Sequence, residues 1–543
     1  MGMQDNSNLS VLIVDPNPGM RGQLHNMLVQ ANITKVEFAQ SSGTAIRQLM
    51  KRSYDIILCE YDLGSQEDGQ DGQQLLEDLR LHKLIGLWTI FIMITSEGIY
   101  SKVISAAELV PTDYILKPFT VDVLSARIQR AIERRMAFLP TYQLIGQGNL
   151  REAIKSCASG EANMPRYAVE FAKLRAELHM SLEEYAEAEE MYRNILATKP
   201  IGWAHLGLAR AMIAQGRSLD AQAELVRLTT ENPKFMAAYD LLATCYKTNG
   251  DVQAAQRTLE TAVSISPHVV RRLRVLGDTA LESGDFGMAE KSFKQVLIKA
   301  RYSEFRNPED HVNLVRTLVA RNDNVQAAAT IRDLERSLRG VASVDVCKAI
   351  STALMQEANG NIDAAVEQLQ AAAAGMKTAE GLSTRLRLDL AKSCLDYSLD
   401  EEATAVVMNV MADPNSEMPA PQAVQFFVKH GREDLAETIN SHLKAQVAEL
   451  MAKAEDRSKT GDHKGATQAM LEALHMQPGN LQVLFAASRI FLRQIDAMGW
   501  DHTLAERIYG DIDTIKRIDA HNDKLPKLEE EFEAVRRKYG IGV

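Results

Sequence analysis

Four polar residues stand at or just beyond the ends of apolar, strand-like runs: Asp15, Glu60, Thr95 and Lys117. They supply two carboxylates, a hydroxyl and an ammonium group. Carboxylate oxygens are the ligands that hard cations such as Mg²⁺ prefer, and a lysine can pair with the same carboxylates. Such residues act together only where the surrounding elements bring them to one place.

The runs that carry these residues belong to an alternating pattern of strands and helices. Five strand-like runs, at residues 9–14, about 35–39, 55–59, 89–95 and 113–116, alternate with amphipathic helical stretches up to about residue 137. This pattern predicts an α/β domain of the flavodoxin-like type, with a five-stranded parallel sheet. Functional groups in such a domain gather at the carboxyl ends of the strands, which is where the polar residues stand.

Four segments resemble the CheY-like receiver domain of bacterial response regulators, over about the first 130 residues. Residues 11–18 look like its first strand and acidic loop, and residues 54–64 like its third strand and phosphoacceptor loop. Residues 92–96 are similar to its fourth strand with a hydroxyl residue, and residues 113–119 to its fifth strand ending in Lys-Pro. In that family an aspartate takes a phosphoryl group from a histidine kinase, acidic side chains hold Mg²⁺, and Thr and Lys stabilise the product.

The resemblance implies a role for each residue of the set. The positions are the phosphoacceptor (Glu60), the acidic pocket (Asp15), the phosphate-stabilising pair (Thr95 and Lys117), the aromatic switch (Tyr114) and a peptide bond that is usually cis (Lys117 to Pro118). Because Thr95, Tyr114 and Lys117 are all retained, we expect a residual signalling surface, although each is also an ordinary residue at a strand end.

The sequence departs from the family at two of these positions. Glu60 replaces the aspartate, and its extra methylene moves the carboxylate out of the in-line geometry that phosphoryl transfer requires. Pro16 replaces the second acid beside Asp15, which weakens any Mg²⁺ site that Asp15 and Glu60 would form. The sequence therefore predicts a receiver that is not a working phosphoacceptor and that holds no cofactor.

Two interpretations of Glu60 remain open. In the first, its longer carboxylate approaches Thr95 and Lys117 as a phosphoryl group would and holds the receiver near an active-like conformation. In the second, the site has decayed and Glu60 only forms an ion pair with Lys117. Asp62, two residues further on, is an alternative phosphoacceptor. It shares the strand face of Glu60 by alternation but lies out in the loop.

From residue 138 onward the strand pattern ends and a helical repeat begins. In steps of 34 residues the sequence aligns Leu208 with Leu242 and Leu276, Gly216 with Gly250 and Gly284, and Ala221 with Ala255 and Ala289. Small residues let two antiparallel helices approach, and a glycine turns the hairpin. The pattern resembles the tetratricopeptide repeat, whose hairpins stack into a superhelix.

Later units repeat the signature more weakly. The hairpin glycine recurs at Gly360, Gly431 and Gly461, and weaker units centre on Ala328 and Ala403. Residues 481–543 keep the helical period without the signature. We therefore predict a receiver at residues 1–137, a repeat array at 138–480 and a helical cap at 481–543.

Composition restricts the class of protein. A hydrophobic share of 46% and a charged share of 24% are typical of a soluble globular protein. A formal charge of -11 disfavours DNA or an anionic membrane as the main partner. The first six residues lack a signal peptide's basic and apolar regions, so we expect a cytoplasmic protein.

Two functions are consistent with these features. The first is an atypical response regulator, whose degenerate receiver and repeat scaffold modulate or inhibit a histidine kinase or another response regulator by protein–protein interaction, with a homodimer as a further option. The second is a regulator switched by phosphorylation of Asp62 or Glu60. No nucleotide-binding, metalloprotease or nucleophile-elbow motif occurs in its expected context, so an enzyme is not expected.

Overall fold

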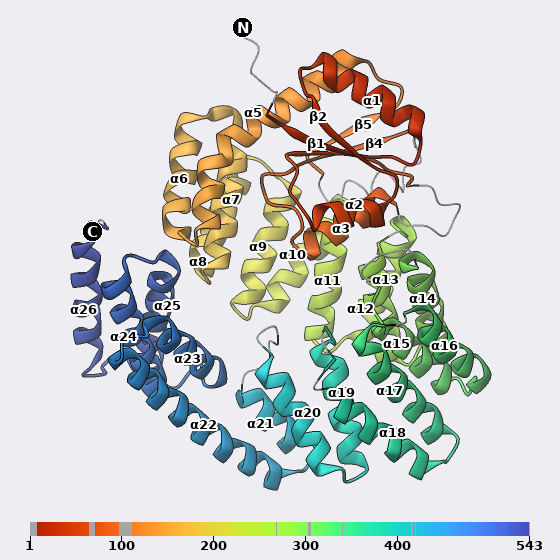
Figure 1. Ribbon diagram of the computed structural model, residues 1–543, viewed down its shortest axis with the longest axis vertical. Helices are drawn as coiled ribbons and strands as arrows, with labels where there is room; N and C mark the ends of the chain where they lie inside the picture. Colours follow the sequence, from red (N-terminus) through yellow and green to blue (C-terminus); the bar gives the residue numbers. More distant parts are fainter. Residues whose placement is uncertain are drawn as a thin grey trace. The chain divides into compact units, whose positions relative to one another are not determined.

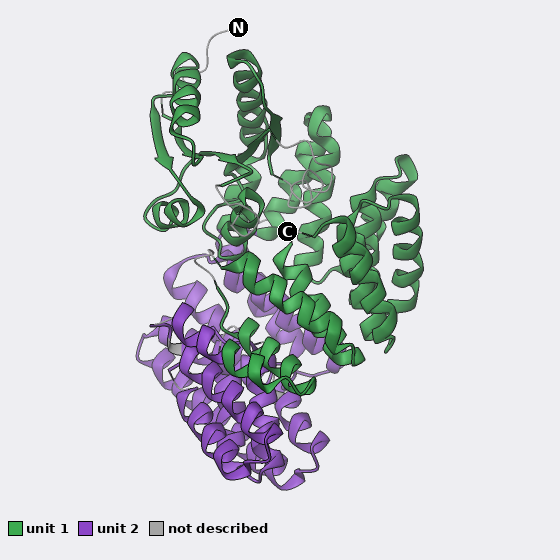
Figure 2. Cartoon of the chain, turned by 90° about the vertical axis from the view of Figure 1, so that its right-hand side faces the viewer, with its two compact units in different colours: residues 1–146, 150–330 green, residues 147–149, 331–543 purple. Residues whose placement is uncertain are grey.

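The computed structural model describes residues 8–63, 71–96 and 111–541, apart from short gaps at residues 268, 302–305, 339, 377, 380, 414–415, 417 and 419. The first six residues, which bear on a leader sequence, lie outside this part of the chain. The chain divides into two compact units (Figure 2). One holds residues 1–146 and 150–330, and the other residues 147–149 and 331–543.

A five-stranded parallel sheet forms the amino-terminal part of the first unit (Figure 1). Its strands are β1 (Ser10–Val14), β2 (Lys35–Ala39), β3 (Ile56–Glu60), β4 (Ile90–Thr95) and β5 (Asp113–Leu116), in the order β2-β1-β3-β4-β5. Strands β1, β3 and β4 are apolar along almost their whole length because helices cover both faces of the sheet. The predicted flavodoxin-like fold is confirmed.

Helices pack on each face of this sheet. Helices α1 (Pro18–Gln30) and α5 (Val121–Gly146) bury Leu24 and Ile128 against one face. Helices α2 (Ser42–Leu49) and α3 (Gly72–Leu81) bury Ile46 and Leu76 against the other. The residues between β4 and β5 lie mostly outside the described part of the chain.

The strand register places the carboxyl ends of the strands level with one another. Val14 pairs with Cys59 across β1 and β3, Glu60 with Ile94 across β3 and β4, and Thr95 with Leu116 across β4 and β5. Each polar residue of interest ends one of these strands or follows it directly. The sheet therefore gathers them at a single edge.

Helix α5 belongs both to the sheet domain and to the helical array. Beyond the sheet, its residue Phe138 stacks on Phe171 of the array with ring centroids 4.0 Å apart, and Arg134 pairs with Glu170 at 2.5 Å. The boundary predicted between residues 137 and 138 falls inside this continuous helix.

Arginines along α5 also tie the helix to the sheet. Arg127 pairs with Asp113 and Arg135 with Asp55, each at 2.8 Å. Asp55 also accepts hydrogen bonds from the amide and hydroxyl of Ser10, at the start of β1. Ion pairs of Arg127, Arg134 and Arg135 therefore attach α5 to the sheet and to the first hairpin.

The rest of the first unit is a row of antiparallel helical hairpins. After α6 (Leu150–Asn163) and a short turn, η1 (Pro165–Tyr167), come α7 (Ala168–Ser181), α8 (Tyr185–Thr198), α9 (Gly202–Ala214), α10 (Ser218–Glu231), α11 (Met236–Thr248), α12 (Val252–Ile265), α13 (Val270–Ser283), α14 (Phe286–Ala300), α15 (Glu309–Ala320) and α16 (Asn324–Ser337). Helix α16 continues into the second unit.

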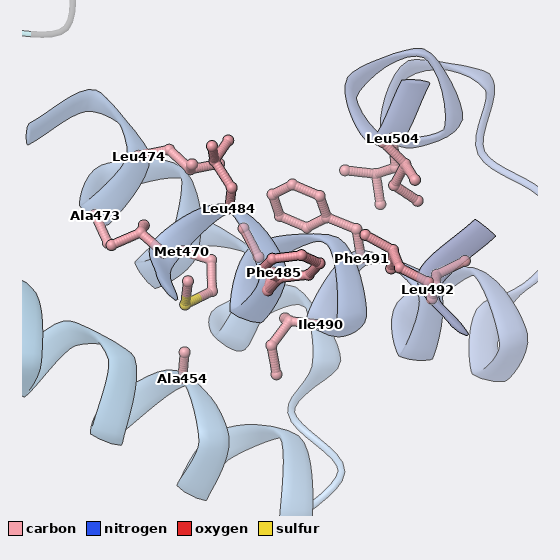
Figure 3. Close-up of a cluster of buried hydrophobic side chains, with 14 of the residues drawn as sticks. Ala454, Met470, Ala473, Leu474, Leu484, Phe485, Ile490, Phe491, Leu492 and Leu504 are labelled. Carbon is pink, nitrogen blue, oxygen red and sulfur yellow. The ribbon is translucent and has the colours of Figure 1, made fainter. Parts of the chain in front are cut away.

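The second unit continues the hairpins and ends in a helical core. Its helices are α17 (Ala342–Ala358), α18 (Ile362–Gly375), α19 (Thr384–Asp396), α20 (Asp400–Ala412), α21 (Ala420–Lys429), the long α22 (Glu433–Lys459), α23 (His463–Met476), α24 (Leu481–Met498), α25 (His502–Ile518) and α26 (Leu525–Lys538). One cluster of buried side chains, with Met470, Phe485 and Phe491, runs through α22 to α26 (Figure 3). No helix in the described residues is long and apolar enough to cross a membrane.

The glycines that mark the repeat take the backbone conformation expected of them. Gly216, Gly250 and Gly284 have φ angles of 78°, 84° and 83°, in the left-handed region that glycine enters without steric cost. Three hairpins place another residue in this conformation: Glu183, Asn322 and Ser398, with φ of 59°, 59° and 58°. The hairpins of Asn322 and Ser398 belong to the weaker units centred on Ala328 and Ala403, where the missing glycine made the sequence pattern hard to recognise.

We expect Glu183→Gly to stabilise the protein by about 0.5–1 kcal/mol, because a non-glycine residue in the left-handed region costs about 1–2 kcal/mol and part of the relief is lost to the flexibility of the unfolded chain. The measurement is the urea concentration at half-unfolding. Asn322→Gly is the control and should have a smaller effect, since asparagine enters this region more readily. Equal effects at both positions would contradict the explanation.

The lowered pKa of Asp55 predicts that the stability of the fold depends on pH. Burial raises the pKa of Asp55, but hydrogen bonds from Ser10 and Arg135 outweigh burial and lower the pKa overall. Ionised Asp55 therefore stabilises the fold above about pH 4, and this contribution is lost as the pH falls through the folded-state pKa. Asp55→Asn should lower stability at pH 7, and the difference from the native chain should shrink at pH 3. Denaturant titrations at both pH values test this, with the exposed Asp122→Asn as control.

Candidate functional site

The carboxyl edge of the sheet brings together the residues singled out in the sequence. Asp15 follows β1, Glu60 ends β3, Thr95 ends β4 and Lys117 follows β5. Asp15 and Thr95 are buried, with 2% and 1% of their surface exposed. The side chains of Glu60 and Lys117 are 10% and 18% exposed. The site is therefore a largely enclosed pocket of two carboxylates, a hydroxyl and an ammonium group.

Lys117 is the centre of this pocket. Its ammonium group donates a hydrogen bond to Oε2 of Glu60 and lies 3.6 Å from Oδ2 of Asp15. Its backbone amide donates to the carbonyl of Thr95 at 2.7 Å, which fixes the start of the side chain beside β4. The bond between Lys117 and Pro118 is cis, as the resemblance implied. Lys117 thus contacts groups at the carboxyl ends of three other strands.

Glu60 has both carboxylate oxygens engaged. Oε2 accepts from Lys117, and Oε1 accepts from the backbone amides of Tyr61 at 2.8 Å and Asp62 at 3.3 Å. Burial raises the pKa of Glu60, and Lys117 and the Asp62 amide offset only part of this effect. A carboxylate placed like this is held in position by the protein itself.

Asp62 and Tyr114 lie apart from this group. Asp62 is exposed in the loop after β3, and it is its amide that contacts Glu60. Tyr114 is half-buried with its hydroxyl covered, and its ring packs against the core between the sheet, α2 and α3. The structure therefore joins Asp15, Glu60 and Lys117 directly and leaves the alternative acceptor outside the pocket.

Two residues of the pocket were missed in the sequence. The Asn17 amide donates to Oδ1 of Asp15 at 2.8 Å, while its side chain caps α1. Nη1 of Arg21 donates to the carbonyls of Asp15 at 2.6 Å and Pro16 at 2.9 Å. An asparagine before a proline is a recognised helix start, so Asn17 was predictable as a cap. No sequence signal identifies Arg21, because its contacts depend on how the loop folds.

The side chains do not fit the Mg²⁺ that the receiver family implies. A hard cation needs several oxygen ligands with lone pairs turned toward it. Oδ1 of Asp15 and both oxygens of Glu60 already accept hydrogen bonds from protein groups. Oδ2 of Asp15 is buried and accepts none, but the Lys117 ammonium lies 3.6 Å from it, where a second cation would be repelled. Across the described ranges, no three acidic, histidine or cysteine side chains lie together as a metal site would require.

Comparison with known proteins agrees with this architecture. Residues 11–129 match the response regulator receiver domain family, and residues 237–269, which cover α11 and α12, match the tetratricopeptide repeat family. Chemotaxis protein CheY-3 of Vibrio cholerae is 29% identical over 129 residues, which is 24% of this chain and 95% of that protein. Chemotaxis protein CheY of Pseudomonas aeruginosa is 28% identical over 126 residues, 23% of this chain and 98% of that protein.

Solved structures with similarity to parts of the chain include both kinds of domain. The BeF3-activated DrrB receiver domain is 18% identical with a TM-score of 0.20, covering 23% of this chain and 97% of its own. A tetratricopeptide repeat protein from Parabacteroides merdae is 14% identical with a TM-score of 0.32, covering 47% and 96%. The family matches and the fold together identify the chain as a response-regulator receiver domain of the CheY-like type fused to tetratricopeptide repeats.

Proposed function

We propose that this protein is an atypical response regulator whose receiver keeps one conformation without phosphorylation. Its repeat array binds a histidine kinase or another response regulator in the cytoplasm and modulates, or inhibits, phosphotransfer between them. The observation that carries this proposal is the contact between Lys117 and Glu60. In this proposal Glu60 takes the position where the family holds a phosphoryl group, with a carboxylate of the chain itself beside Lys117.

The pocket argues against phosphoryl uptake. An acceptor carboxylate must present a free oxygen in line with the leaving group, and a cation must neutralise charge on the transferring oxygens. Both oxygens of Glu60 are engaged, and the Lys117 ammonium that would stabilise a phosphoryl group already contacts Glu60 and Asp15. Phosphorylation of Glu60 would have to break these contacts first.

The repeat array supports a binding role. A receiver and tetratricopeptide repeats imply protein–protein interactions, and stacked hairpins offer an extended surface for them. No DNA-binding or enzymatic motif was found in the sequence to serve as an output. A partner bound by the first hairpin would be held close to the receiver, because α5 joins the two without a linker. A second copy of the chain is an alternative partner.

The second candidate is a regulator switched at Asp62. The observation in its favour is that Asp62 is exposed next to the pocket, whereas Glu60 is enclosed. In that case phosphorylation of Asp62 would change the loop after β3 and through it the availability of the array.

Intact mass after incubation with a small phosphodonor and Mg²⁺ separates the two candidates. We expect no gain of a phosphoryl group in the native full-length chain, because its acceptor position is occupied by Glu60 paired with Lys117. Asp62→Asn should behave like the native chain, and Glu60→Asp combined with Pro16→Asp should gain one group, because the two substitutions restore the acceptor and the second acid of the family. A Mg²⁺-dependent gain in the native chain that vanishes in Asp62→Asn would establish the second candidate instead.

The lysine at the centre of the pocket should carry much of the receiver's stability. Lys117→Met should destabilise the protein by about 3 kcal/mol, because it removes the cation that contacts the enclosed carboxylates of Glu60 and Asp15. Urea unfolding measures the loss, with the exposed Lys35→Met as control. In a Glu60→Gln background the same substitution should cost less, and an equal cost in both backgrounds would contradict the pairing.

A further inference from the structure

The loop between β1 and α1 contains a cation that the proposed function does not use. Arg21 lies in the first turns of α1, and its Nη1 donates to the backbone carbonyls of both Asp15 and Pro16. These are the two positions whose side chains form the acidic pair in receivers that hold Mg²⁺. The guanidinium is thus bonded to the backbone of both positions on which a metal site would depend.

We infer that Arg21 is a metal-excluding residue, which together with Lys117 supplies the positive charge that a divalent cation would otherwise bring. The inference rests on the proposed function and names the residue that makes the site independent of Mg²⁺. It also implies that the loss of the acid at Pro16 is only half of the reason why the pocket rejects a metal.

The charges of the pocket support this role. Asp15 and Glu60 carry two negative charges, and Lys117 and Arg21 carry two positive charges. A divalent cation entering here would meet one carboxylate oxygen that accepts no hydrogen bond, Oδ2 of Asp15, and the Lys117 ammonium 3.6 Å from that oxygen would repel it. The Arg21 guanidinium, bonded to the backbone carbonyl of the same residue, adds to the repulsion.

Hydrogen bonding supports it as well. The Asn17 amide occupies Oδ1 of Asp15, and Arg21 holds the carbonyls on either side of the bond between Asp15 and Pro16. The two contacts fix the backbone at position 16. A carboxylate restored at position 16 would still belong to a loop whose backbone is hydrogen-bonded to the Arg21 guanidinium.

Binding of Mn²⁺ to the full-length chain tests the inference. Mn²⁺ takes the same oxygen ligands as Mg²⁺, and free Mn²⁺ is counted directly by its electron paramagnetic resonance signal. The starting variant is Pro16→Asp, which restores the missing carboxylate. Arg21→Gln is then added to remove the charge, and Arg21→Lys to keep the charge while losing the fork of donors.

We expect Pro16→Asp to bind Mn²⁺ weakly, and addition of Arg21→Gln to tighten binding at least tenfold. Arg21→Lys should leave the affinity close to that of Pro16→Asp alone. No gain from Arg21→Gln, or an equal gain from Arg21→Lys, would overturn the inference. Tight Mn²⁺ binding by the native chain would instead count against the proposed function.

A second background guards against misfolding of the double variant. Glu60→Asp shortens the carboxylate and leaves the β1–α1 loop intact, and the same two Arg21 substitutions should give the same order of affinities there. Thermal unfolding of every variant shows whether the fold is kept. The opposite order in the Glu60→Asp background would overturn the inference even if the first background agreed.

Discussion

One largely enclosed cation connects the groups at the carboxyl edge of the sheet. Lys117, after β5, contacts carboxylates that follow β1 and end β3, and its own amide is bonded to the last residue of β4. Charges enclosed to this degree are tolerated only when they are paired. Lys117 therefore links the carboxyl ends of four strands that the ladder hydrogen bonds of the sheet have brought level.

The same ion pair changes what the receiver can report. In a pocket that waits for a phosphoryl group, the cation is a spare contact that becomes occupied when the signal arrives. Here Lys117 contacts Glu60, a carboxylate of the chain, and Arg21 donates to the backbone of the neighbouring loop. Under the proposed function, the activity of the protein is controlled by which partner proteins it binds and not by phosphorylation.

Much of this organisation follows from local sequence patterns. The strands β1, β3 and β4 are apolar runs because helices bury both faces of the sheet, and Gly216, Gly250 and Gly284 mark turns that only glycine adopts without cost. Other features depend on contacts between distant residues. The contacts of Arg21 form only once the loop between β1 and α1 has folded. Helix α5 packs on the array through contacts of Phe138 with Phe171 and of Arg134 with Glu170, and the periodicity of the sequence does not predict these contacts.

Because α5 runs without a break from the receiver into the first hairpin, it connects the two parts rigidly. A flexible linker would let the two parts turn independently, and its length would matter little. An α-helix advances by about 100° for each residue, so the residues between Arg135, which is bonded to the sheet, and Phe138, which is stacked on the array, set a fixed phase between the two. Evolution of this chain can then tolerate substitutions along α5, but a single inserted or deleted residue would turn the first hairpin's binding surface to a different side of the receiver.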